Sequence, residues 1–193
     1  SFGRGINDSV NALYTLDAEL NIIGKIEDVA RGERVYSVRF DGDIGYFVTF
    51  RQVDPLFAVD LSDAKKPKIL SELKIPGFSD YLHMFDEGLL FGFGRDADEQ
   101  TGAIHGLKLS MFDVSDNTNV SEKHVYKLQE YWSEASYNHK AIIVSADRNI
   151  IAFPSDNKYR VFSYDAQKGF AAKGSFMSDD GGYNLRGLYI GNT

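Results

Sequence analysis

One pattern recurs four times along the chain at nearly regular spacing, in which an apolar segment runs into a polar turn that contains aspartate. The positions that align within this pattern are 45, 53 and 50 residues apart in successive copies. Repeats of about 20–50 residues indicate a protein built by stacking copies of one structural unit. The aligned positions are Thr15, Asp60, Asp113 and Ser163, in segments 12–17, 57–63, 111–116 and 160–165.

Each unit also contains further apolar segments of strand length. Three of the repeated segments are preceded by a hairpin, at 35–50, 81–93 and 141–153, with tips at 41–43, 86–88 and 147–149. All four are followed by one more apolar segment, at 22–29, 68–75, 121–128 and 170–176. Glycine or asparagine at the tips provides the positive φ that short hairpins need. Four strands per unit of about 50 residues predict an all-β fold, a β-propeller with four-stranded antiparallel blades.

The predicted strands are apolar on both faces, as at 89–91 and 142–144. This is expected for sheets that are packed between other sheets, whereas a sheet with one wet face alternates strictly. One segment fits a helix equally well, because Val125, Leu128 and Trp132 follow one another at i, i+3 and i+7. The repeat favours a strand here, since the segment aligns with 68–75 of the preceding unit.

The repeat divides the chain into whole and partial blades within a single β-propeller segment, 1–193. We expect a part-blade at 6–30, whole blades at 34–76, 78–129 and 135–177, and a part-blade at 183–193. Open sheet edges and uncovered apolar faces tend to associate with other polypeptide. We therefore expect a fragment of a larger propeller, or a chain that closes on itself or self-associates with a second copy through its open blade edges.

Composition excludes several classes of function. The formal net charge is −7, from 21 basic and 28 acidic side chains, so nucleic acid is not expected as a partner. The chain has no cysteine, which rules out disulfides, thiolate metal sites and a thiol nucleophile. No apolar run is long enough to span a membrane as a helix, and the first 30 residues contain no signal-peptide pattern.

Several longer strings resemble one known family. The strings are 36–40, 47–56, 106–116 and 138–141, and they are similar to the β-propeller domain of secreted bacterial and archaeal proteins, a family distantly similar to WD-repeat propellers. The resemblance covers nearly the whole chain. It implies a secreted or cell-surface location and a propeller that extends beyond this chain. It implies no activity and no catalytic residue, because the family is functionally uncharacterised.

Four basic or titratable side chains occupy one register of the predicted innermost strands. They are Arg39, His83, His139 and Arg186. Propellers usually bind ligands at the channel mouth, so these side chains predict a site for a small anionic ligand with a carboxylate, phosphate or sulfate group. The alternative is that each side chain satisfies backbone groups or channel water.

Two loops provide further candidates. Trp132, with Tyr131 and Tyr137, lies in the loop before the third whole blade and could stack on a carbohydrate or contact a protein partner; the alternative is that these rings wedge between blades. Asp96, Asp98 and Gln100 alternate as in a calcium loop, but Gly102 comes one position late and Leu107 stands where a glutamate is required. A solvated acidic loop is therefore favoured over a calcium cofactor.

No enzyme signature is present, so the leading hypothesis is an extracellular ligand- or protein-binding or scaffold module. The alternative is an enzyme, a hydrolase or lyase that acts on an anionic carbohydrate or peptide at the channel mouth. In that case His83 or His139 would act as acid or base beside Arg39 and Arg186.

Overall fold

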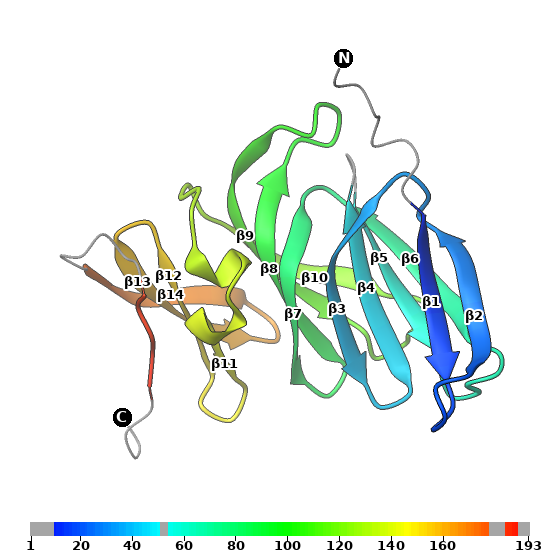
Figure 1. Ribbon diagram of the computed structural model, residues 1–193. Coiled ribbons are helices and arrows are strands. Elements are labelled where there is room, and N and C mark those ends of the chain that lie inside the picture. Colours follow the sequence, from blue (N-terminus) through cyan, green and yellow to red (C-terminus); the bar gives the residue numbers. More distant parts are fainter. Residues whose placement is uncertain (1–9, 51–53, 178–183, 189–193) are drawn as a thin grey trace.

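The computed structural model describes residues 10–50, 54–177 and 184–188, and Figure 1 shows their sheets side by side in chain order. The first sheet has two strands, β1 (Asn11–Leu16) and β2 (Ile22–Val29). The second contains β3 (Arg34–Asp41), β4 (Ile44–Phe50), β5 (Asp54–Asp60) and β6 (Lys68–Ile75). The third contains β7 (Phe78–Asp86), β8 (Leu89–Ala97), β9 (Ile104–Asp113) and β10 (Ser121–Lys127). The fourth contains β11 (Ile143–Ser145), β12 (Ile150–Ser155), β13 (Lys158–Asp165) and β14 (Gly169–Met177).

Every sheet is antiparallel and its strands follow chain order, which confirms the predicted fold class of four-stranded propeller blades. The ambiguous segment is a strand: β10 pairs with β9 from Ser121 opposite Asp113 to Lys127 opposite Lys108. The predicted part-blades at 6–30 and 183–193 lie partly outside the described residues.

The fourth sheet differs from the prediction at its first strand. Two short 3-10 helices, η2 (Glu134–Ser136) and η3 (His139–Ala141), precede it, and β11 therefore begins at Ile143. The Ser133 hydroxyl accepts a hydrogen bond from the Ala135 N–H, and the Asn138 side chain accepts one from the Lys140 N–H. Such local bonds offer the backbone an alternative to strand pairing, which explains why the apolar pattern from 141 does not begin a strand there.

The hydrophobic core lies between successive sheets. One cluster joins the second and third sheets around Leu56, Leu90 and Phe112, and another joins the third and fourth around Phe93 and Phe153. The third sheet is packed between the second and the fourth, and its strands β8 and β9 are accordingly apolar on both faces, as the sequence predicts. This packing brings the first strands of the second and third sheets, β3 and β7, side by side.

Candidate functional site

The first strands of neighbouring sheets position the predicted ligand residues. A hydrogen bond from the Ser37 hydroxyl to the Ser79 carbonyl, 2.6 Å long, links β3 to β7. The Tyr36 and Phe78 rings lie 4.7 Å apart across the same junction. These contacts place Arg39 of β3 near Tyr81 and His83 of β7; we refer to these three residues as the inner-strand cluster.

Arg39 is the cation of the inner-strand cluster. It is half-buried on β3 opposite Tyr46 of β4. Its Nε atom is buried and has no hydrogen-bond partner, and no carboxylate in the described part of the chain forms an ion pair with it. An incompletely paired guanidinium is a donor group available to a ligand.

His83 and Tyr81 are the neutral members of the cluster. Burial, and then the charge of Arg39, lower the pKa of His83, so its imidazole is neutral at pH 7. Burial raises the pKa of Tyr81, against the opposing effect of Arg39, so its hydroxyl stays protonated. The Tyr81 hydroxyl and His83 Nδ1 are hydrogen-bonded at 2.8 Å. The cluster therefore combines one positive charge with two neutral polar groups.

Arg186 is neutralised by a residue that the sequence did not single out as its partner. Its Nη2 atom donates to Oε1 of the buried Glu134 at 2.6 Å. The Asn138 amide donates to the same oxygen at 2.7 Å, and the Asn184 N–H donates to Oε2 at 3.0 Å. The hydrogen bond from Arg186 is the main cause that lowers the pKa of Glu134. This network ties η2 to the segment 184–188.

The predicted set of four side chains is thus divided. Arg39 and His83 are close, as the register predicts. His139 lies exposed on η3 rather than on a strand, and Arg186 is paired with Glu134. Within the described ranges, no hydrogen bond, ion pair or charge effect joins either of them to Arg39 or His83.

Asp80 is a functional candidate that the sequence does not reveal. Its side chain is only 12% exposed, and its Oδ2 lies 3.8 Å from Nε of Arg95 without a hydrogen bond. Burial raises the pKa of Asp80 to about 6, although the Ser136 hydroxyl and the Arg95 charge oppose the shift. The register shift between Ser79 and Tyr81 on β7 breaks the alternation of faces here. An aspartate in an apolar strand is the one signal that could have found it.

The aromatic loop is partly exposed. Trp132 is half-buried, and its backbone N–H donates to Oδ1 of Asp156 at 3.3 Å. Tyr131 and Tyr137 are exposed. These tyrosines are therefore accessible for stacking, whereas much of the Trp132 surface is already covered.

In the acidic loop at 95–102, carboxylate oxygens of Asp96 and Asp98 are occupied by hydrogen bonds and an ion pair within the protein. Oδ1 of Asp98 accepts hydrogen bonds from the Gln100 N–H and from the Thr101 N–H and hydroxyl, and the Thr101 hydroxyl contributes most to lowering the pKa of Asp98. Asp96 is buried, with its Oδ1 2.9 Å from Nζ of Lys127. Among the described residues no three His, Asp or Glu side chains are grouped so as to hold a metal ion. Calcium binding stays the untested alternative to the solvated acidic loop that the sequence favours.

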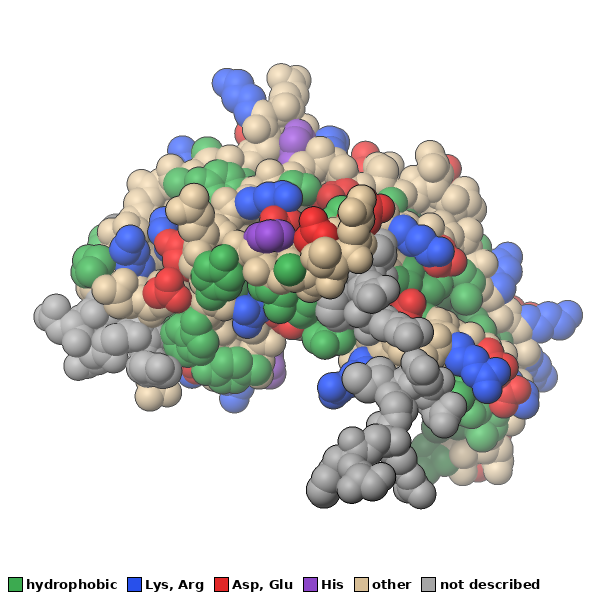
Figure 2. All heavy atoms as spheres, turned by 90° about the horizontal axis from the view of Figure 1, so that it is seen from above, with side chains coloured by type: hydrophobic (Ala, Val, Ile, Leu, Met, Phe, Trp, Pro, Cys, Tyr) green, Lys and Arg blue, Asp and Glu red, His purple; other side chains and the backbone are tan. Residues whose placement is uncertain are grey.

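Acidic, basic and hydrophobic side chains are interspersed on the face seen in Figure 2, and neither acidic nor basic side chains form a broad patch there. A ligand on this face would have to be recognised by individual side chains rather than by a broad charged patch. No helix in the described ranges has the length and apolar character needed to cross a membrane.

Comparison with known proteins identifies relatives of nearly the whole chain. The sequence model of a family described as Beta propeller domain matches residues 2–192. An uncharacterised protein of Archaeoglobus fulgidus is 46% identical over 176 residues, which are 88% of this chain and 27% of that protein. An uncharacterised protein of Methanocaldococcus jannaschii is 40% identical over 183 residues, 94% of this chain and 28% of that protein. The chain thus spans little more than a quarter of the length of these curated relatives.

Two solved structures are distantly similar. A chain in the complex of S. cerevisiae Dbp5 with Nup159, Gle1, IP6 and ADP matches 83% of this chain and 34% of its own length, at 13% identity and a TM-score of 0.45. A protein from Lactobacillus plantarum matches 87% of this chain and 66% of its own, at 13% identity and a TM-score of 0.35. Both likenesses are too distant to bear on function.

Proposed function

Because the chain belongs to the Beta propeller domain family, we propose that it is a non-enzymatic binding module whose ligand carries an anionic group. The observation that carries this proposal is Arg39, whose buried Nε lacks a partner among the described residues beside the neutral His83. Phosphate, sulfate and carboxylate groups all match the forked donor geometry of a guanidinium.

The free-energy cost of removing the Arg39 guanidinium from water also supports an anionic ligand. Taking a guanidinium out of water is unfavourable unless hydrogen bonds and an opposite charge compensate it. Glu134 provides that compensation for Arg186, whereas no described carboxylate provides it for Arg39. An anionic ligand would complete the hydrogen bonds of Arg39, with Tyr81 and His83 as neutral polar neighbours.

The test is ligand-induced stabilisation with phosphate, sulfate and acetate as probes. A ligand at ten times its Kd adds about 1.4 kcal/mol to the free energy of unfolding, which raises Tm by roughly 3–5 °C. We expect this rise for the parent and for the control Arg34→Gln, which changes an exposed arginine on the same strand. We expect it to be absent in Arg39→Gln. A flat response to all three anions, or an equal response in Arg39→Gln, contradicts the proposal.

An enzyme at the channel mouth is the second candidate, and Asp80 favours it. A carboxyl group with a pKa of about 6 can act as a general acid or base near neutral pH. Screening anionic polysaccharides and peptides tests this function. Turnover that is lost in Asp80→Asn or in His139→Ala would replace the binding proposal with a hydrolase or lyase.

We also propose an extracellular setting, which is supported by the resemblance of the sequence to propeller domains of secreted proteins. We expect the protein at the cell surface or in the medium of its native host. Fractionation of native cells, with a cytoplasmic marker as control, checks this, and recovery with that marker contradicts it.

A further inference from the structure

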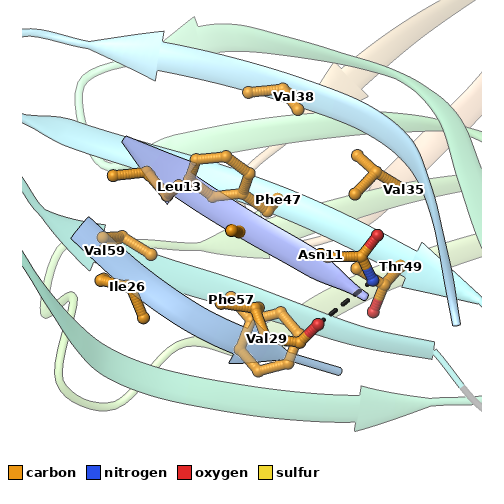
Figure 3. A pocket seen from close by; sticks show the side chains of 11 residues that line it. Asn11, Leu13, Ile26, Val29, Val35, Val38, Phe47, Thr49, Phe57 and Val59 are labelled. Atoms are coloured by element: carbon orange, nitrogen blue, oxygen red, sulfur yellow. Dashed lines mark hydrogen bonds between the residues drawn. The ribbon is translucent and has the colours of Figure 1, made fainter. Parts of the chain in front are cut away.

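A cleft of about 220 Å³ separates the two-stranded sheet from the second sheet. Figure 3 shows Leu13 of β1 and Ile26 of β2 on one side, and Val38, Phe47 and Phe57 of the second sheet on the other. No charged side chain lines the cleft. Its two polar lining residues are already hydrogen-bonded. Asn11 donates to the carbonyls of Val29, Ala30 and Glu33, and the Thr49 hydroxyl donates to the Glu33 carboxylate. The cleft is therefore suited to apolar side chains rather than to a charged ligand.

The repeat shows that this surface is covered in the neighbouring sheet. Val38 is paired with Phe47, and Leu82 is paired with Gly92 at the same register of the next sheet. Leu82 is 3% exposed because the second sheet packs over it, whereas Val38 is 41% exposed. Leu82 and Val38 thus occupy equivalent positions, but a sheet covers only Leu82 in the described part of the chain.

The repeat also shows which chain element fills the corresponding space. Strand β1 aligns with β5 through Thr15 and Asp60, so Leu13 aligns with Ala58. Beside β5 lies β4, which places the buried side chains of Tyr46 and Val48 against the third sheet. In the described residues β2 is the only strand paired with β1, and no strand stands where β4 would.

We infer that the cleft is a strand-acceptor site, in which a β-hairpin pairs antiparallel with the open edge of β1 and places two large apolar side chains, at alternating positions, against Val38 and Phe47. The occupant is polypeptide of the same protein that lies outside the described residues. The length of the relatives supports this source, because their matched region is only 27% and 28% of each protein. Edge pairing gives affinity through the main chain, and alternating side chains give register. This inference is independent of the proposed ligand site.

Thiol accessibility in the protein as expressed from its whole gene tests the inference. The chain contains no cysteine, so Val38→Cys, Leu82→Cys and Val125→Cys each introduce one thiol into it. Val125 is the matched control, since it is 41% exposed like Val38 but lies on β10, and Leu82 is the buried reference. The rate of maleimide modification at each site is read by peptide mass spectrometry.

We expect the thiol at 38 to react at least about tenfold more slowly than the thiol at 125, and at a rate close to that at 82, because the hairpin covers it. Equal rates at 38 and 125 overturn the inference. Protection at 38 that disappears on dilution also overturns it, because the occupant would then be a second copy.

Discussion

Asp113 accepts hydrogen bonds from both the N–H and the hydroxyl of Ser115, and Asp60 accepts one from the N–H of Ser62. The repeated aspartate is thus a turn-forming residue that hydrogen-bonds the backbone two positions later. The Ser115 hydroxyl is the main cause that lowers the pKa of Asp113. The ionised Asp113 carboxylate therefore stabilises the fold above about pH 4, and this stabilisation is lost as the pH falls through the lowered pKa of Asp113.

Single residues of the candidate site could be predicted only where the repeat placed them. Arg39 and His83 share a register on neighbouring strands, and their proximity follows from it. Asp80 and Glu134 could not be found in this way, because their burial depends on a bulge in β7 and on a 3-10 helix after β10. Neither the bulge nor the 3-10 helix produces a periodic pattern of apolar residues that could be recognised in the sequence.

Asp80→Asn should stabilise the protein at alkaline pH. The pKa of Asp80 is raised to about 6 in the folded state, from an unfolded value near 4, so its negative charge destabilises the fold above pH 6. We expect a gain of the order of 2 kcal/mol at pH 8 that vanishes as the pH falls from 6 to 4. Urea unfolding across this pH range measures it.

The control for this experiment is Asp43→Asn, which changes an exposed aspartate at the β3–β4 tip. Because this side chain is exposed, we expect the free energy of unfolding of Asp43→Asn at pH 8 to stay within about 0.5 kcal/mol of that of the parent. Loss of stability in Asp80→Asn at pH 8 would instead mean that Arg95 fully compensates the carboxylate.

The strands lie where the repeat predicts them, except where local side-chain hydrogen bonds favour a 3-10 helix. The spacing of Val125 and Leu128 fits a helix, but pairing with β9 makes 121–127 a strand. The 3-10 helix η3 replaces the start of the strand predicted from 141, because Asn138 caps it. Strand pairing is a long-range interaction, so a local pattern alone could not decide either case.

Gly106 of β9 is required by a close backbone approach. Its φ is +144°, and a Cβ atom there would lie 2.1 Å from the Leu128 carbonyl oxygen. We expect Gly106→Ala to lower Tm by roughly 5 °C or more, because both the φ and the contact oppose a side chain. Differential scanning calorimetry measures the change.

Gly174→Ala on β14 is the matched control, since a Cβ at that position meets no atom within 4 Å. We expect its Tm to stay within about 2 °C of the parent. Similar losses in both variants would contradict this explanation, because at a position without strain or close contact Gly→Ala lowers the entropy of the unfolded chain and does not reduce stability.

At the scale of the whole molecule, aromatic rings between the sheets hold the structure together. Phe153 of β12 is fully buried, with its ring 4.7 Å from that of Phe93 in the preceding sheet and 5.7 Å from that of Phe162, with which it stacks. Contacts of this kind cross from one repeat to the next, so each sheet is stabilised by its neighbour.

Phe153→Ala should therefore be among the most destabilising substitutions. Removing a fully buried phenylalanine reduces the free energy of unfolding by about 3–5 kcal/mol, which corresponds to a fall in Tm of roughly 10 °C for a chain of this size. Phe176→Ala, at an exposed position on β14, should change Tm by less than about 2 °C. Thermal unfolding of both variants checks this, and equal effects contradict an inter-sheet core centred on Phe153.

The amino-acid sequence by itself determined most of the strands, their order and the turns between them, because apolar periodicity and turn residues act over a few neighbouring positions and the repeat supplies the register. The tertiary structure alone decided which polar side chains are buried, which charges are paired and which apolar faces are covered. Glu134 pairs with Arg186 across 52 positions of the chain. Leu82 is buried because a sheet packs over it, whereas Val38, at the equivalent position of the preceding repeat, is 41% exposed. Desolvation and pairing depend on such distant neighbours, and local sequence carries no record of them.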